Sequence, residues 1–588
     1  MYILGLNAYH GDSSACIVKD GELLAAMEEE RFLRVKHAAG FPKLAVGKCL
    51  EKAGIGIEDL DIITINRNPS ERLLKKVLFS LRHRPSFQLV SSRLKNYFDV
   101  KAPSEKLANE IGVDPERIKA KVIPVEHHRA HLASSFYPSP FKKSAILSVD
   151  GFGDFCSTLK ATGEDETINV MSEVVFPHSL GIFYLAMTQF LGFHNYGDEY
   201  KVMGLAPYGQ PRYLDEMREL VKVTGNGEGF ELNLDYFSFF KKKVSMTWED
   251  TVPTNPEIFS ENITKLLGPV RQKKDEVTQR HMDLAISLQR RYEEVLFALL
   301  DDLYEKTGED NLCLAGGCGM NSVANGKITA NTKFKKVFIQ PAAGDSGGAI
   351  GAALYVSHHI NGISRKETMN HSYYGPSYDK AAIEEALLKR KSELADKSFE
   401  IKKDLSDKEV VELISDKLVE SKVIGWFQDS MEWGPRALGN RSIIADPRNK
   451  NMKDILNLKI KFRERFRPFA PSILEEKVKD WFLTDDTEVP FMLKVYKFRA
   501  EKGSLVPAVC HVDGSGRLQS VSSKANPRYH ALISSFYKKT DVPMILNTSF
   551  NENEPIVDTP DQALDCFLRT KMDVLVLQNT VILREENL

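Results

Sequence analysis

Three histidines fall within five residues of this 588-residue chain, at positions 127, 128 and 131, although the whole chain contains only 14. The residues before them, 122–125, are typical of a strand, and those after them of a helix. His127 and His131 would then lie one turn apart on one helical face, where two imidazoles can share a metal ion. His128 with His131 is a poorer alternative, and a helix start with capping or core histidines is the simpler structural explanation. The local concentration of histidines favours a metal site.

Two aspartates are the best candidates to complete such a site with oxygen ligands. Asp150 ends a strand expected over 144–150, and Asp345 lies in the glycine-rich stretch 344–348. Mixed imidazole and carboxylate ligation suits a transition metal rather than calcium. We therefore expect a divalent metal, with iron favoured and manganese or zinc as alternatives. The predicted ligands are His127, His131, Asp150 and Asp345.

A second group of residues is cationic. The glycine- and proline-containing loop 432–442 carries Arg436 and Arg441, and basic residues then alternate with others along 459–467. If that segment were extended, all its cations would lie on one face: Lys459, Lys461, Arg463, Arg465 and Arg467. Guanidinium and ammonium groups bind phosphate well, so the cluster predicts a phosphate or polyphosphate site. A solvated basic face is the alternative. Nucleic acid is disfavoured, because acidic residues balance the basic ones elsewhere and no aromatic stacking platform accompanies the cluster.

The elements that must position these residues form a repeated pattern. A buried strand over 2–7, a small polar loop and strands near 15–19 and 22–28 are followed later by the same arrangement. The second copy has strands at 144–150, near 155–161 and near 167–175. Two such units facing each other would form a cleft with an acidic loop on each side. The pattern predicts an α/β fold with a duplicated actin-like ATPase domain, of the ASKHA or ribonuclease H-like type.

Glycine loops and a change of pattern complete the organisation. The stretches 315–321 and 344–348 each follow a strand and precede a helix, which lets backbone N–H groups approach a nucleotide, although tight helix–sheet packing also explains glycine pairs. The periodicity is interrupted at 357–372. We predict two domains, residues 1–360 and 370–588, the second an α/β domain with strands at 422–427, 542–546 and 573–577. The segment 546–551 ends the second of these strands with amides and hydroxyls suited to a nucleotide or small anion.

Composition narrows the class of protein. A formal charge of −2 and a pI of about 6.7 give no overall drive towards nucleic acid or anionic membranes. The first residues resemble no signal peptide, and no apolar run approaches the length that spans a bilayer. The seven cysteines are scattered without a Cys-x-x-Cys pair, which favours reduced thiols. We expect a cytoplasmic protein without a membrane or nucleic-acid partner; a homodimer is left open.

Taken together, these motifs resemble the NodU/CmcH family of O-carbamoyltransferases. The resemblance covers nearly the whole chain, and its motifs occur in the family's order. The matching segments are residues 9–14, 28–32, 126–131, 201–209, 315–317, 344–347, 434–442, 467–471 and 546–551.

The resemblance implies a reaction in two stages. A YrdC-like C-terminal domain would convert carbamoyl phosphate and ATP, the latter with magnesium, into carbamoyl-adenylate, releasing phosphate and pyrophosphate. Arg436, Arg441, Arg463, Arg467 and the catalytic Lys461 would neutralise the phosphates. Asn547 and Ser549 would position the nucleotide.

The N-terminal domain, by the same resemblance, would transfer the carbamoyl group from the adenylate to a hydroxyl-bearing acceptor. Gly316, Gly317 and Asn321 would hold the adenylate, and the metal would polarise it. His10 or Asp12 would take the proton of the acceptor hydroxyl. The acceptor, a small molecule or a glycan, is not specified by the sequence.

Three other functions use similar folds. An actin-like sugar or small-molecule kinase is the main alternative, but it leaves the cations of the second domain without a task. An Hsp70-like interaction protein would need a peptide-binding β-domain. A tRNA threonylcarbamoylation enzyme would need a basic tRNA-binding surface, which this nearly neutral chain does not indicate.

Overall fold

The computed structural model describes residues 1–83, 108–240, 247–249, 251–254, 256–395, 398–464 and 466–585. Their contacts divide the chain into two compact units, Met1–Met369 and Asn370–Leu588. Each unit has its own sheets and its own buried apolar core. Among the described residues, no helix combines the length and the apolar composition needed to cross a membrane.

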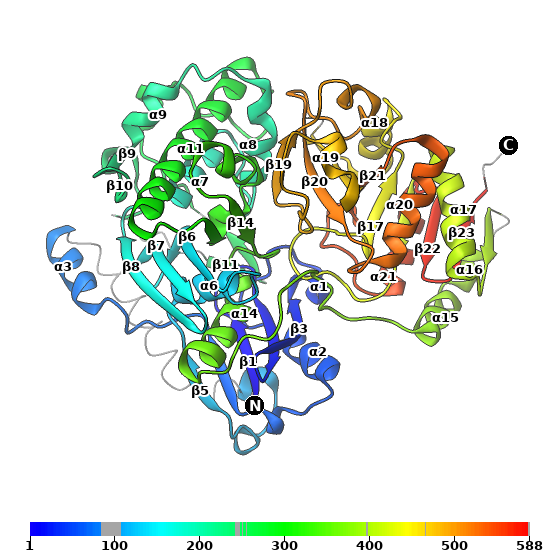
Figure 1. Ribbon diagram of the computed structural model, residues 1–588, viewed down its shortest axis with the longest axis horizontal. Helices are drawn as coiled ribbons and strands as arrows, with labels where there is room; N and C mark the ends of the chain where they lie inside the picture. The colour runs from blue at the N-terminus through cyan, green and yellow to red at the C-terminus, as the bar shows by residue number, and fades with distance from the viewer. Residues whose placement is uncertain are drawn as a thin grey trace. The chain divides into compact units, whose positions relative to one another are not determined.

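The first unit contains two five-stranded sheets that share one strand order (Figure 1). The first sheet runs β3-β2-β1-β4-β5, with strands β1 (Tyr2–Asn7), β2 (Ser14–Lys19), β3 (Glu22–Glu28), β4 (Ile62–Ile65) and β5 (Lys121–Pro124). The second runs β8-β7-β6-β13-β14, with strands β6 (Lys143–Gly153), β7 (Cys156–Glu164), β8 (Thr167–Val175), β13 (Asn311–Ala315) and β14 (Lys336–Ile339).

The pairing directions also match between the two sheets. In each, the first three strands form an antiparallel meander, and the last two join it in parallel. Asp20 and Gly21 form the turn of the first meander, with φ of 50° and 86°. The prediction of a duplicated actin-like, ribonuclease H-like domain is thereby confirmed.

Two helices, one from each half of the first unit, lie between the two sheets and pack against each other. Helix α6 (His127–Phe136) packs on β6 and β13, helix α14 (Gly347–Leu354) packs on β1 and β2, and the two helices pack on each other (Figure 1). The backbones of the two helices come very close at Gly351, where an added Cβ would lie only 1.8 Å from the carbonyl oxygen of Ala130. This close packing places the start of α6 beside the loop that precedes α14.

The second unit is built on one nine-stranded mixed sheet, in the order β15-β23-β22-β16-β17-β21-β18-β20-β19. Its strands are β15 (Phe399–Lys402), β16 (Ile424–Phe427), β17 (Arg441–Ala445), β18 (Ala470–Leu474), β19 (Lys494–Lys497), β20 (Ser515–Val521), β21 (Met544–Ser549), β22 (Val574–Leu577) and β23 (Thr580–Arg584). The helices α17 (Asp407–Val419) and α20 (Pro527–Thr540) pack together, as do α15 (Lys380–Lys389) and α21 (Pro560–Arg569). The α/β class is confirmed, and the YrdC-like fold of this unit stays a prediction.

Candidate functional site

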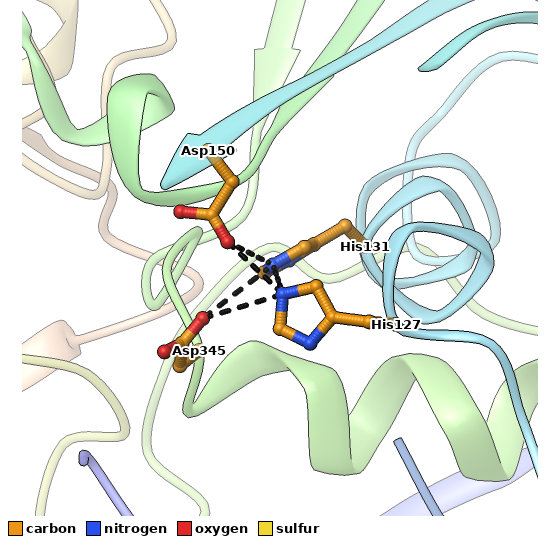
Figure 2. A group of neighbouring side chains, drawn as sticks. All are labelled: His127, His131, Asp150 and Asp345. Atoms are coloured by element: carbon orange, nitrogen blue, oxygen red, sulfur yellow. Dashed lines mark hydrogen bonds and ion pairs between the residues drawn. The ribbon is translucent and has the colours of Figure 1, made fainter. Parts of the chain in front are cut away.

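Four side chains from distant parts of the first unit converge at the start of α6 (Figure 2). The Nε2 atoms of His127 and His131 lie 3.0 Å apart, and each lies 3.0–3.1 Å from Oδ2 of Asp150. Oδ1 of Asp345 completes the group at 3.6 and 3.7 Å from the two Nε2 atoms. The four predicted metal ligands are thus brought together, and all are largely buried.

The spacing of these four atoms fits one transition-metal ion. With metal–ligand bonds of about 2.1 Å, neighbouring ligand atoms lie about 3.0 Å apart in octahedral and about 3.4 Å apart in tetrahedral geometry. The observed separations of 3.0–3.7 Å span this range. Oδ1 of Asp345 is buried and has no hydrogen-bond partner among the described residues, as expected of an oxygen that awaits a cation. The residues present therefore fit a metal with nitrogen and oxygen ligands.

The electrostatics of the group keep both carboxylates ionised. Burial would raise the pKa of Asp150, but its hydrogen bonds with His127 and His131 hold that pKa well below its usual range. Burial and the neighbouring Asp150 would likewise raise the pKa of Asp345, but His10 and His131 keep it below its ordinary value. Burial would lower the pKa of His131, yet its hydrogen bond with Asp150 and the negative charge of nearby Asp345 raise that pKa to about 9. A metal ion would therefore meet two carboxylates and displace protons from the imidazoles.

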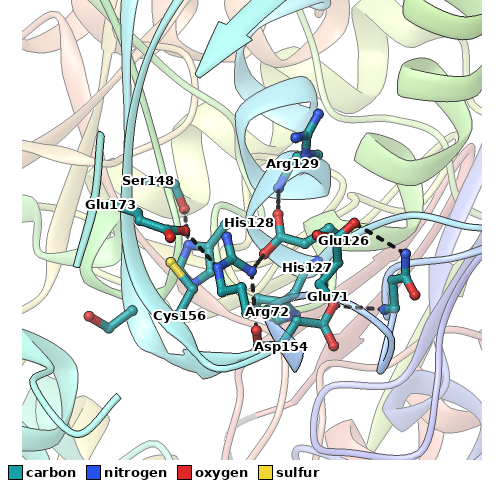
Figure 3. A network of polar contacts seen from close by, with 12 residues as sticks. Glu71, Arg72, Glu126, His127, His128, Arg129, Ser148, Asp154, Cys156 and Glu173 are labelled. Atoms are coloured by element: carbon teal, nitrogen blue, oxygen red, sulfur yellow. Dashed lines mark hydrogen bonds and ion pairs between the residues drawn. The ribbon is translucent and has the colours of Figure 1, made fainter. Parts of the chain in front are cut away.

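His128 points away from this group, towards strand β6. Its Nδ1 lies 2.8 Å from the hydroxyl of Ser148 (Figure 3), and burial beside the other two histidines keeps its pKa well below the usual value. His128 is therefore a neutral core residue, and the pair one turn apart, His127 and His131, is the one that faces the aspartates.

The two candidates for a general base have different partners. Nδ1 of His10 lies 3.2 Å from Oδ2 of Asp345, so one carboxylate contacts both the histidine pair and His10. Asp12 instead pairs with His37, with 2.7 Å between Oδ1 and Nδ1. Burial would lower the pKa of His37, but Asp12 raises it to about 9, so the pair is an ion pair near neutral pH.

The first glycine loop packs against the metal group. Gly316 has φ of 87°, and a Cβ there would lie 2.2 Å from the carbonyl oxygen of Val149. The amide of Gly317 donates to Oδ1 of Asp150 at 2.9 Å, which orients that carboxylate. Asn321 caps the following helix through the amide of Ala324 and pairs with Gln289. Its side chain thus has contacts within the protein, while the glycines hold Asp150 in place.

In the second unit, the cations do not share the face of a strand. The expectation of an extended segment over 459–467 is wrong: residues Asn457–Lys461 form a π-helical turn, η7, and Phe462 follows with φ of 42°. The turn buries Lys461, whose Nζ donates to carbonyl oxygens of Ser549 and Asn551 at 2.7 Å each. Lys461 therefore supports the loop after β21, in which the hydroxyl of Ser549 donates to Asn551. Arg465 lies outside the described residues.

Arg441 is fully buried and bound to the protein's own backbone. Its guanidinium donates to carbonyl oxygens of Gln428, Asp429 and Asp558, and it lies 3.7 Å from the ring centroid of Phe427. These contacts hold the loop before β17, so Arg441 shapes the loop that carries Arg436. The guanidinium of Arg441 therefore binds the protein's own backbone rather than a phosphate.

Arg517, which the sequence pattern does not indicate, lies near three of the arginines predicted to bind phosphate. Burial and the positive charges of Arg436, Arg463 and Arg467 hold the pKa of Arg517 well below its ordinary value, so Arg517 lies within electrostatic reach of the other three. Arg463 also lies 4.4 Å from the ring centroid of Phe469. The only signal for Arg517 is a single cation on β20, whose other residues are buried.

Asn547 lies on β21 in a buried polar cluster. Its Nδ2 donates to the carbonyl oxygen of Ala437, to the hydroxyl of Ser472 and to Oε1 of Gln519. Its Oδ1 is buried with no hydrogen-bond partner among the described residues. Asn547 thus connects the arginine loop to the sheet and keeps one acceptor available.

Comparisons with known proteins agree on one family. Residues 2–354 match the family model described as Carbamoyltransferase N-terminus, and residues 415–584 match Carbamoyltransferase C-terminus. Nodulation protein NolNO of Sinorhizobium fredii is 38% identical over 585 residues, covering 98% of this chain and 79% of that protein. Nodulation protein NolO of Bradyrhizobium diazoefficiens is 40% identical over 457 residues, covering 77% and 78%. An uncharacterized protein of Synechocystis is 41% identical over 613 residues, covering 99% and 96%.

A duplicated actin-like domain with a histidine–aspartate group at its centre defines the class of this protein. The chain belongs to the carbamoyltransferase family, and it is a carbamoyltransferase. Its likeness to the crystal structure of T. kodakarensis HypF is weak, with a TM-score of 0.30 and 13% identity over 62% of this chain and 48% of that chain. The fold assignment therefore rests on the strand order.

Proposed function

We propose that this protein is an ATP-dependent O-carbamoyltransferase that works through carbamoyl-adenylate. The observation that carries the proposal is Asp345, whose two oxygens face the histidine pair and His10 respectively. A metal-binding group and a base joined by one carboxylate suit the attack of a hydroxyl on a carbonyl carbon. Membership of the carbamoyltransferase family supports the identity of the transferred group.

In the first stage, the second unit would form the adenylate. Water splits carbamoyl phosphate into carbamate and phosphate, and a carbamate oxygen then attacks the α-phosphorus of ATP, which expels pyrophosphate. Magnesium accompanies the ATP. The four neighbouring arginines, Arg436, Arg463, Arg467 and Arg517, neutralise the phosphates. Lys461 acts by holding the loop of Ser549 in place for the nucleotide, and Asn547 offers its buried acceptor.

In the second stage, the first unit would transfer the carbamoyl group. His127, His131, Asp150 and Asp345 would hold the metal, with iron favoured over manganese and zinc. A metal held there would supply Lewis acidity next to the adenylate. Gly317 keeps Asp150 oriented through its amide, beside the adenylate.

His10 is the base that we assign to this stage. Its Nδ1 faces Asp345, which leaves Nε2 to take the proton as the acceptor oxygen attacks the carbonyl carbon and AMP departs. Asp12 is the poorer base because its carboxylate is paired with protonated His37. The acceptor is a hydroxyl of a small molecule or a glycan.

Incubation with ATP and 14C-labelled carbamoyl phosphate tests the proposal. We expect AMP and pyrophosphate, with pyrophosphate release that depends on carbamoyl phosphate, and label in an AMP-linked product when no acceptor is added. A kinase would instead release ADP. Formation of ADP, without carbamoyl-dependent pyrophosphate, would contradict the proposal.

A further inference from the structure

We infer that four residues outside the metal ligands, Arg72, Glu126, Asp154 and Glu173, form a positioning network that sets His127 for metal binding (Figure 3). The four come from separate segments: the residue before α3 (Leu73–His83), the residue before α6, the turn between β6 and β7, and strand β8. We call them the Arg72 network. The inference rests on the metal site proposed above.

Arg72 is the centre of the network. Its Nη1 lies 2.8 Å from Oε1 of Glu126, and its Nε lies 2.6 Å from Oε2 of Glu173. Nη1 also donates to the carbonyl oxygen of Asp154 at 3.1 Å. The side chains of Arg72 and Glu126 are only 10% and 1% exposed. A planar guanidinium with several donors can bridge these groups in fixed directions, which an ammonium cannot.

Two carboxylates of the network, those of Glu126 and Asp154, hold the first turn of α6. Oε2 of Glu126 accepts the amide of Arg129 at 2.8 Å and caps the helix. Oδ2 of Asp154 accepts the amide of His127 at 2.9 Å and the amide of Asn68 at 2.7 Å. The amides at the start of a helix lack partners within the helix, so these carboxylates fix where α6 begins. His127 is the first residue of that helix, and its position follows.

Loss of Arg72 would leave a buried carboxylate without its ion partner. Breaking a buried pair in this way is strongly unfavourable, so Glu126 would turn towards water and release the amide it caps. Asp154 would lose the contact that holds its backbone. Metal ligands need positions accurate to about 0.5 Å, so a small movement of the first turn would misplace Nε2 of His127. Arg72 itself has φ of 57°, a strained conformation of the kind that is kept at functional sites.

Substitutions in the Arg72 network should therefore weaken metal binding even in variants whose folded state is as stable as that of the wild type. The matched pair Asp154→Ala and Asp154→Asn separates the two roles, because asparagine keeps an acceptor oxygen for the amides of His127 and Asn68, whereas alanine removes it. Lys75→Ala is the control for charge: Lys75 lies 2.5 Å from Glu173, but its side chain is 48% exposed, so the loss of this ion pair should have little effect.

The experiment measures bound metal per chain and the affinity for Fe(II) and Zn(II), by competition with a chelator, on the full chain, with thermal unfolding in parallel. We expect Arg72→Ala and Asp154→Ala to weaken metal binding about 10- to 100-fold, and Asp154→Asn and Lys75→Ala to change it little. If Asp154→Ala folds and binds metal with wild-type affinity, the inference is overturned. Should Arg72→Ala fail to fold, the metal affinity of Asp154→Ala alone provides the test. Equal metal binding by wild type and His127→Ala would instead overturn the metal site itself.

Discussion

Gly153 lies against the ring of His127, and replacing it with alanine perturbs the metal group without changing any of its ligands. A Cβ at position 153 would lie 2.0 Å from both Cγ and Cδ2 of His127 and 2.6 Å from its Cβ. Non-bonded carbon atoms normally stay about 3.5–4.0 Å apart, so the imidazole would have to move by about 1.5 Å. Metal–ligand distances hold to within about 0.2 Å, so His127 could not keep its place as a ligand.

Gly153→Ala should therefore weaken metal binding more than a substitution of a residue that only hydrogen-bonds to a metal ligand. Such supporting changes cost about 10- to 100-fold in metal affinity, so we expect Gly153→Ala to lose about 100-fold or more. The assay is bound metal per chain together with chelator competition, and thermal unfolding shows that the chain is folded.

Gly151→Ala is the matched control on the same strand. A Cβ added at position 151 meets no atom within 4 Å, so this variant should bind metal like wild type. If Gly153→Ala also kept wild-type affinity, the ring of His127 would not be the metal-binding group, and the reasoning from the four converging side chains would be refuted.

Three further predictions concern the base, the phosphate site and the half-buried ion pair of Asp12 and His37. His10→Asn should slow carbamoyl transfer about 100-fold or more while carbamoyl-dependent pyrophosphate release persists; unchanged transfer would exclude His10 as the base. Arg517→Ala should slow pyrophosphate release at limiting carbamoyl phosphate about tenfold through a higher KM, and an unchanged KM would remove Arg517 from the phosphate site. Because Asp12 raises the pKa of His37 from 6.5 to about 9, the pair stabilises the folded state fully below pH 6.5 and loses this contribution as pH rises towards 9. His37→Gln should flatten the fall of Tm over that range, and an unchanged profile would contradict the ion pair.

The parts of the fold that depend on local pattern could be predicted from the sequence. Both meanders follow from strand periodicity and from turns such as Asp20-Gly21, which act over a few residues. Local pattern also predicts the pairing of His127 and His131, because helical spacing alone puts them on one face. Spacing does not link Asp345 to these histidines; its place in a loop between a strand and a helix indicates that it can join them.

The cationic residues show where local pattern stops being sufficient. Alternation along 459–467 indicated a strand, but Lys461 reaches carbonyl oxygens about ninety residues later in the chain, and these contacts favour a helical turn instead. Arg441 has the same sequence surroundings as Arg436, yet its donors are bound by the backbone of Gln428 and Asp558. Such roles depend on tertiary contacts that spacing does not encode. Arg72 is a further example, since its partners lie on three other segments.

The position of the candidate site follows from the duplication itself. His10 lies in the loop after β1, and Asp150 lies near the end of β6, the corresponding strand of the second sheet. His127 begins α6 after β5, and Asp345 precedes α14 after β14, again at corresponding places. Because α6 and α14 pack on each other between the sheets, these two junctions meet. The fold thus brings corresponding strand ends of the two halves together. The half with β1 contributes the histidines and the half with β6 contributes the aspartates, so the candidate metal site has mixed nitrogen and oxygen ligands.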